Sequence, residues 1–228
     1  MYRRLAMLSL LFTLATLGPT AALADPPDIS GALPGAEVLI DVGHGGIDGG
    51  THHGDVLEKD INLAVARKLY LMLGSQGIDA VLNRDSDYAL SDDNRWHPIR
   101  SRHKRDLAQR RQLAREIPTR IIVSLHVNWT PDKTERGPLV LYKEDGHSML
   151  LAQCIQDALN QQQHTSAQPR SGRTFYLLRK TDKPAVIVEM GFLSHAGDRD
   201  MMTRPQGQTE IAKAICNGLR QYLLVTGR

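Results

Sequence analysis

The chain has 228 residues, of which 41% are hydrophobic and 23% are charged. This length and composition suit one globular domain with a proper core, and they exclude a largely disordered or repetitive chain. The net charge is +3, and Arg3 and Arg4 contribute two of those charges. No run of lysine and arginine with interleaved aromatic residues is present either, so a nucleic-acid partner is not expected.

Residues 1–24 have the pattern of a secretory signal peptide. Arg3 and Arg4 precede an apolar stretch over 5–17, and small residues at Ala22 and Ala24 form a cleavage site. A membrane anchor is the alternative, but spanning a bilayer takes roughly 20 apolar residues. We therefore expect cleavage near Ala24, no stable membrane span afterwards and a periplasmic location. The arginine pair leaves Sec and twin-arginine export both open.

After a proline-rich tether over residues 25–36, apolar strands alternate with amphipathic helices. The pattern predicts strands over 38–42, 80–82, 121–125, 139–142, 175–178 and 185–188. It predicts helices over 61–72, 106–116, 151–159 and 211–222, and a long charged loop over about 85–105. This alternation indicates an α/β fold: a single twisted, mostly parallel sheet of about six strands, flanked by helices on both faces.

Several classes of site are excluded by their missing motifs. Cys154 and Cys216 form no CxxC pair, so a cysteine metal site is excluded. They are either two buried free thiols or one disulfide that joins two helices. No GxSxG elbow of a serine hydrolase is present, and the GHGG stretch at 43–46 lacks the spacing of a nucleotide-binding loop.

Polar side chains stand at the ends of three predicted strands. His44 follows the first strand, His126 ends the third, and Glu189 follows the last. Glu58 lies immediately before the first predicted helix. Because the carboxyl ends of parallel strands meet at one edge of a sheet, we expect these four side chains to share one cleft.

Two imidazoles and one carboxylate are a recurrent set of catalytic zinc ligands, and they leave a fourth position open for water. A further carboxylate can then take a proton from that water. The residues leave open which glutamate has which role. Taken singly, His44 could be a loop histidine, His126 a core histidine and Glu58 a helix-start carboxylate. The shared edge favours a metal site.

The basic segment 95–111 is expected to be a solvated loop and helix face, with a substrate-facing role as the alternative.

Four ordered motifs carry a family resemblance that covers about 37–224. They are IDVGHGG at 40–46, EKDINL at 58–63, SLHVN at 124–128 and VEMGFLS at 188–194. With them the chain resembles the zinc-dependent N-acetylmuramoyl-L-alanine amidases of the amidase-3 type. The resemblance implies Zn²⁺ held by His44, Glu58 and His126, with Glu189 as the catalytic carboxylate. It also implies a mostly parallel sheet flanked by helices, here as a catalytic domain over 37–228.

The implied reaction is hydrolysis of peptidoglycan at the amide bond between the lactyl group of N-acetylmuramic acid and L-alanine of the stem peptide. Asn128 and Arg179 are candidate substrate contacts, and an activator protein is conceivable. A zinc peptidase acting within the stem peptide and a catalytically silent cell-wall binder are the rival interpretations. Some cell-division members insert a helix that blocks the site. The stretch 129–173 is too short for that insertion, so we expect an uncovered site.

Overall fold

The computed structural model describes residues 35–92 and 98–227, so the expected signal peptide and nearly all of the tether lie outside the described residues. The strands are β1 (Ala36–Val42), β2 (His52–His53), β3 (Val56–Leu57), β4 (Ala80–Leu82), β5 (Thr119–Asn128), β6 (Leu139–Tyr142), β7 (Arg170–Ser171) and β8 (Ala185–Phe192). The helices are α1 (Glu58–Ser75), the 3₁₀ turn η1 (Leu90–Asp92), α2 (Arg102–Glu116), α3 (Gly146–Gln163), α4 (Tyr176–Lys180), α5 (Ala196–Thr203) and α6 (Pro205–Val225).

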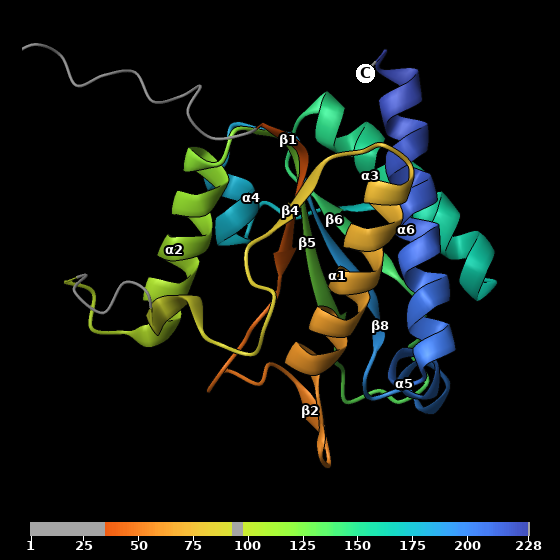
Figure 1. The fold of residues 1–228 in the computed structure, drawn as a ribbon. Helices are drawn as coiled ribbons and strands as arrows, with labels where there is room; N and C mark the ends of the chain where they lie inside the picture. Colours follow the sequence, from red (N-terminus) through yellow and green to blue (C-terminus); the bar gives the residue numbers. More distant parts are fainter. Residues whose placement is uncertain (1–34, 93–97, 228) are drawn as a thin grey trace, which may run out of the picture.

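Six strands form one sheet in the order β4-β1-β5-β8-β6-β7 (Figure 1). The four strands β4, β1, β5 and β8 run parallel, while β6 pairs antiparallel with β8. The long apolar runs of β1, β5 and β8 lie at the centre, where both faces are covered, as expected for buried parallel strands. The carboxyl ends of β1, β5 and β8 therefore meet at one edge, near the small hairpin of β2 and β3.

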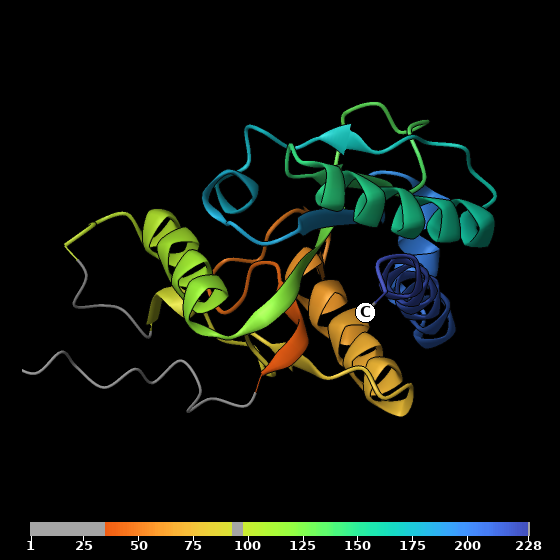
Figure 2. The same ribbon diagram turned by 90° about the horizontal axis from the view of Figure 1, so that it is seen from above.

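Helices cover both faces of the sheet (Figure 2). One face carries the larger core, in which alternate residues of β1, β5 and β8 pack with α1, α3 and α6. The other face carries a smaller core, in which Leu39, Ile122 and Ile187 pack with Ala114 of α2 and Leu177 of α4. The predicted α/β fold with a mostly parallel sheet of six strands is confirmed. Among the described residues, no helix is long and apolar enough to cross a bilayer.

The strand predicted over 175–178 is wrong. These residues begin the short helix α4, in which Leu177 and Leu178 are buried while Phe175 and Tyr176 are not. Four consecutive apolar residues carry no period, so the run alone cannot separate a strand from a buried helical turn. Arg179 and Lys180 in the last turn suit the negative end of a helix. The sixth strand of the sheet is instead β7.

The two cysteines lie on neighbouring helices and form no disulfide. Cys154 on α3 and Cys216 on α6 are both buried free thiols. Of the two alternatives, the structure therefore supports free thiols. Burial raises the pKa of both thiols, which makes them poor nucleophiles.

Helices α3 and α6 pack backbone against backbone at Gly218. A methyl group added there would lie 2.6 Å from Cα of Ile155 and 2.8 Å from the carbonyl oxygen of Cys154. Both neighbours are helix backbone, which cannot move without shifting α3. We therefore expect Gly218→Ala to lower the free energy of unfolding by about 1–3 kcal/mol, measured by urea denaturation.

Gly74→Ala is the matched control for this substitution. Gly74 lies in α1, and a methyl group there would meet nothing within 4 Å. Alanine should raise the free energy of unfolding by roughly 0.5–1 kcal/mol, because it restricts the unfolded chain and favours the helix. A loss of stability in both variants, or in neither, would contradict the assigned packing.

Candidate metal centre and active site

The loop after β1 turns sharply and presents His44 at the carboxyl edge of the sheet. His44 has φ of 60°, in the left-handed region that few residues other than glycine adopt. Gly45 and Gly46 follow with φ of 143° and 58°. A methyl group on Gly45 would come within 2.2 Å of the carbonyl oxygen of Tyr88, so the loop packs backbone against backbone. The glycine-rich sequence is thus required for the turn that aims His44.

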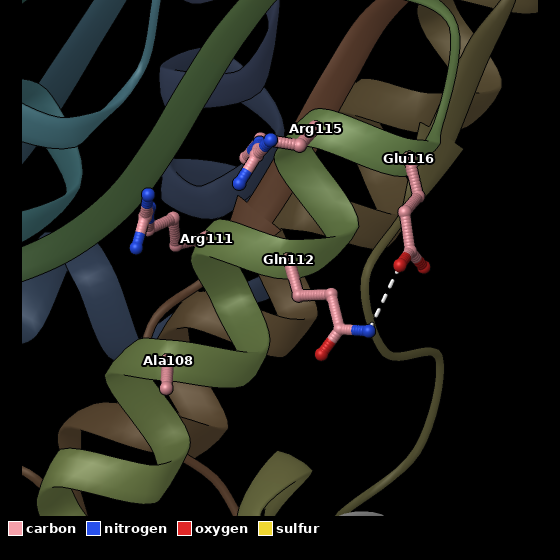
Figure 3. Close-up of a pocket in the computed structure, with 5 residues that line it drawn as sticks. All are labelled: Ala108, Arg111, Gln112, Arg115 and Glu116. Carbon is pink, nitrogen blue, oxygen red and sulfur yellow. Dashed lines mark hydrogen bonds between the residues drawn. The ribbon is translucent and has the colours of Figure 1, made fainter.

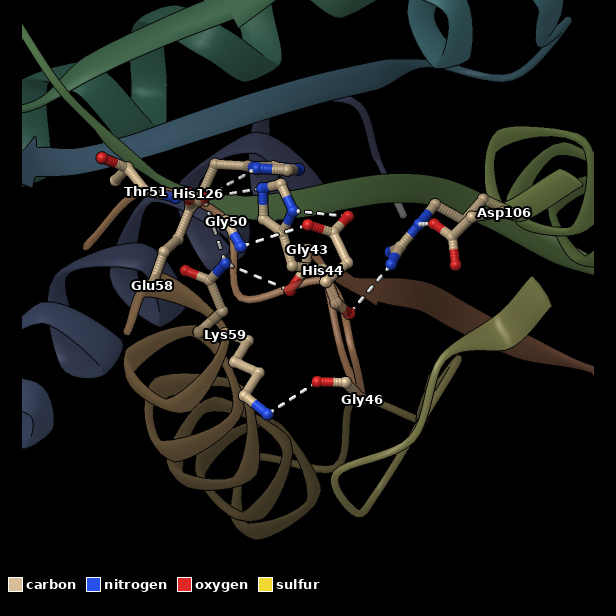
Figure 4. A network of polar contacts seen from close by, with 12 residues as sticks. Gly43, His44, Gly46, Gly50, Thr51, Glu58, Lys59, Asp106 and His126 are labelled. Atoms are coloured by element: carbon tan, nitrogen blue, oxygen red, sulfur yellow. Dashed lines mark hydrogen bonds and ion pairs between the residues drawn. The ribbon is translucent and has the colours of Figure 1, made fainter. Parts of the chain in front are cut away.

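Three side chains converge at this edge, as Figure 4 shows. Oε1 of Glu58 lies 3.2 Å from Nε2 of His44 and 3.0 Å from Nδ1 of His126. One ligand atom from each of the three lies within 4.8 Å of the others. Two imidazole nitrogens and one carboxylate oxygen so placed match the donor set of a catalytic zinc site. The predicted convergence of these three side chains is thus observed, although Glu58 is the first residue of α1 rather than the residue before it.

Glu58 is buried and its carboxylate is held from several sides. Oε1 accepts a hydrogen bond from the backbone N–H of Val127 at 3.0 Å, and Oε2 accepts one from Thr51 at 2.9 Å. Asn62, one turn along α1, donates to Oε1 at 3.3 Å. Burial alone would raise the pKa of Glu58, but the hydrogen bonds with His126 and His44 outweigh it and hold the pKa far below its usual range. Glu58 is therefore ionised at any physiological pH.

His44 has a second carboxylate partner, Asp48, which the sequence did not single out. Nδ1 of His44 lies 3.0 Å from Oδ2 of Asp48, so Nε2 is the nitrogen directed at Glu58. Burial lowers the pKa of His44, but the hydrogen bonds to Asp48 and Glu58 outweigh burial and raise the pKa to about 9. The hydrogen bond with His44 in turn lowers the pKa of Asp48 to about 2. A carboxylate behind a histidine in this way is typical of metal sites.

Glu189 lies on β8 directly opposite His126 on β5. Its Oε2 is buried and has no hydrogen-bond partner among the described residues. Burial raises the pKa of Glu189, and the negative charge of Glu58 adds to the rise, against the attraction of His126 and His44. A half-buried carboxyl with one buried, unpartnered oxygen and a raised pKa is suited to carry a proton between reacting groups.

A buried arginine on α2 holds the loop of His44 through ion pairs and hydrogen bonds. Its burial corrects the expectation that the segment 95–111 is a solvated loop and helix face. Arg110 on α2 is buried and pairs with Asp41 of β1 at 2.8 Å and with Asp106 at 2.6 Å. It also donates to the carbonyl oxygens of Val42 at 2.7 Å and His44 at 3.0 Å. Asp41 itself accepts a hydrogen bond from Ser124 at 2.5 Å. The sequence did offer one sign of this buried ion pair: Asp41 lies inside an apolar run, and a carboxylate there must be paired.

A pocket of about 430 Å³ opens beside His44 and His126. Its walls come from α2, with His103 and Leu107, and from the segment of Phe175 that leads into α4. The side chains of His44 and His126 are 23% and 25% exposed. The connection between β5 and β6, residues 129–138, contains no helix. Within the described parts of the chain, nothing therefore blocks the site, which agrees with the expectation of an uncovered site.

The two remaining candidates lie at different distances from this centre. Asn128 is on β5, two residues beyond His126, and its side-chain oxygen accepts a hydrogen bond from the backbone of Trp129 at 2.8 Å. Arg179 is on α4 and lines a separate pocket with Arg111 and Arg115. The structure thus places Asn128 at the metal edge and Arg179 away from it.

Comparison with known proteins agrees with this centre. The family described as N-acetylmuramoyl-L-alanine amidase (Amidase_3) matches residues 38–221. The germination-specific N-acetylmuramoyl-L-alanine amidase of Bacillus subtilis (strain 168) is 30% identical over 197 residues, which cover 86% of this chain and 83% of the relative.

Solved structures of related amidases have the same fold. The CwlD amidase from Clostridioides difficile, in complex with the GerS lipoprotein, matches with a TM-score of 0.78 and 30% identity over 83% of this chain and 99% of that chain. The catalytic domain of CwlV, an N-acetylmuramoyl-L-alanine amidase from Bacillus (Paenibacillus) polymyxa, matches with a TM-score of 0.71 and 27% identity, covering 83% and 99% of the two chains. The chain therefore belongs to the Amidase_3 family of N-acetylmuramoyl-L-alanine amidases.

Proposed function

We propose that this protein hydrolyses peptidoglycan at the amide bond between the lactyl group of N-acetylmuramic acid and L-alanine of the stem peptide. The observation that carries the proposal is the donor set of His44, Glu58 and His126 beside the half-buried carboxyl of Glu189, in a chain of this family. The pocket next to the donor set supports it, because a branched substrate needs an open approach.

We propose zinc as the ion that the three side chains hold. Nε2 of His44, a carboxylate oxygen of Glu58 and a ring nitrogen of His126 would hold it. When bound there, zinc polarises the scissile carbonyl and lowers the pKa of water toward neutrality. Asp48 fixes the ring of His44 so that Nε2 is directed at Glu58 and would be available to the ion, and Asn62 helps to hold the carboxylate of Glu58 in place.

Glu189 is the proton carrier in this proposal. Its raised pKa and its lack of a partner leave Oε2 free to take a proton from the attacking water. The same oxygen then hands the proton to the nitrogen of L-alanine as the amide bond breaks. His126 lies opposite Glu189 on the next strand, so the proton acceptor and the donor set share one face of the sheet. Asn128, farther along the same strand, is positioned to contact the substrate.

The cell-wall substrate places this activity outside the cytoplasm, in agreement with the signal-peptide pattern of residues 1–24. We propose export, cleavage near Ala24 and a periplasmic location. The C. difficile relative is seen in complex with a lipoprotein, which supports a search for a partner protein of this chain.

The bond cut can be tested by mass spectrometry of purified peptidoglycan digested with residues 25–228. We expect free stem peptides that begin with L-alanine, with release abolished by a chelator and restored by zinc. Products that retain muramic acid would instead indicate a peptidase acting within the stem. Zinc binding without any release would favour a silent wall binder.

Glu189→Gln tests the proton carrier in the same assay. We expect turnover to fall by about 10²–10⁴-fold, since that is the typical contribution of general acid–base catalysis. Zinc content, measured by elemental analysis, should not change because Glu189 is outside the donor set. Near-normal turnover in this variant would refute the role, and loss of zinc would place Glu189 among the ligands.

The charge state of His44 gives a pH prediction. In the zinc-free protein, its imidazole should titrate with a pKa of about 9 in an NMR titration. Zinc needs the neutral ring, so binding at neutral pH should release this proton, and zinc affinity should weaken as pH falls below about 9. Asp48→Asn removes the partner of Nδ1 and should lower the pKa of His44.

Asp55→Asn is the control for this titration, because Asp55 is an exposed carboxylate in the nearby turn between β2 and β3, with no hydrogen bond to His44 among the described residues. It should leave the pKa of His44 unchanged. The assignment fails if both variants move this pKa equally.

Export is tested by fractionating the native cells and sequencing the amino terminus of the protein in each fraction. A terminus at Asp25 is expected. Recovery of the intact chain from the membrane fraction would favour the anchor instead.

A further inference from the structure

The side of α2 that faces α4 carries two pockets rather than one. His103, Leu107, Arg111 and Arg115 recur every four residues, and a helix places each of them next to the one before. The first two line the pocket beside the metal centre, and the last two line a second pocket of about 310 Å³. On the opposite wall, the segment of Phe175 borders the first pocket, and the last turn of α4 borders the second. We call this junction the α2–α4 seam.

The second pocket is strongly cationic. Arg111, Arg115, Arg179 and Lys180 line it, against the single carboxylate of Asp182. None of the four cations makes an ion pair or a side-chain hydrogen bond within the described residues. By contrast, Arg110 on the same helix is fully paired with Asp41 and Asp106. Four cations around one hollow, against a single carboxylate, repel one another, and an anion bound there would relieve that repulsion.

Arg111 provides a second, independent sign of a ligand. Its Nε is buried and has no hydrogen-bond partner in the part of the chain that the structure describes. Figure 3 shows Arg111 and Arg115 together on α2, while the neighbouring Gln112 and Glu116 bond to each other at 2.8 Å. A buried guanidinium nitrogen without a partner is costly, and a carboxylate satisfies it in a two-pronged geometry.

We infer that the α2–α4 seam receives the peptide part of the substrate, and that Arg111 and Arg179 bind a carboxylate of that peptide. The inference rests on the proposed function. An α-helix rises 1.5 Å per residue, so Arg111 lies about 12 Å along α2 from His103 at the metal end. An extended peptide covers about 3.4 Å per residue. The cations are therefore placed for about the fourth residue of a stem whose first residue is at the metal centre.

The length dependence separates this seam from a general attraction of anions to a basic surface. A stem of two residues ends before the cationic pocket, whereas a stem of four residues reaches it. The seam should therefore select for longer stems with free carboxylates. It should act on substrate binding and leave the chemical step at Glu189 unchanged, so its effect belongs in KM rather than in kcat.

The test uses muramyl peptides with stems of two or four residues, the longer stem with free or with amidated carboxylates. The variant is Arg111→Gln with Arg179→Gln. Its matched control is Lys213→Gln with Arg220→Gln, which removes two exposed charges from α6. For the four-residue free acid, we expect the first pair to raise KM about tenfold with kcat unchanged. The two-residue and amidated substrates should show no change, and the control pair should match the wild type on every substrate.

Two results would overturn the inference: an equal loss on short and long stems, or an equal loss on free and amidated stems. Failure of the proposed function looks different, because the wild type would then release no peptide from any substrate. In that case, calorimetric titration of the free four-residue peptide decides the matter. Binding by the wild type that the Arg111/Arg179 variant loses supports the seam, and equal or absent binding refutes it. Binding of a teichoic-acid-type polyanion, but not of the peptide, through the same arginines would also refute it.

Discussion

One buried carboxylate joins the parts of this fold that would otherwise lie separately at the edge of the sheet. Glu58 accepts backbone hydrogen bonds from Thr51, at the hairpin, and from Val127, on β5, while its own position is fixed by α1. It also draws the rings of His44 and His126 to within 3.2 Å and 3.0 Å of one oxygen. Removing this charge would leave two backbone donors and two rings without their common partner, so local structure and metal site depend on the same group.

Two arginines, Arg110 and Arg84, hold the loop of His44 in its unusual backbone conformation. A buried arginine would be costly alone, but Arg110 is matched by two carboxylates and two backbone carbonyl oxygens. Arg84 binds the same loop from the other side, donating to the carbonyl oxygen of Gly43 at 3.1 Å. The loop is thus held by charged groups that point at its carbonyls, which leaves its imidazole free to face the cleft.

The order of the central strands and the helices between them could be predicted because the apolar runs of β1, β5 and β8 are continuous. The meeting of His44, His126 and Glu189 could be predicted too, because the carboxyl ends of parallel strands lie at one edge of the sheet. What escaped prediction depends on partners distant in sequence. Arg110 resembles the other basic residues of α2, and its partner Asp41 stands 69 positions earlier. The helix α4 escaped because four apolar residues have no period, and only tertiary packing decides whether Phe175 pairs with a strand or turns outward.

Glu58 and Glu189 are both carboxyls at one sheet edge, so the residue pattern alone could not assign their roles, and only the family resemblance did. Their surroundings in the structure support that assignment. The pKa of Glu58 is lowered and that of Glu189 is raised. Glu58 has hydrogen-bond donors on both oxygens, whereas Oε2 of Glu189 has none. A group that stays ionised suits a cation, and a group that gains a proton easily suits acid–base work. The division of roles that we propose therefore follows from how many donors the fold aims at each carboxyl.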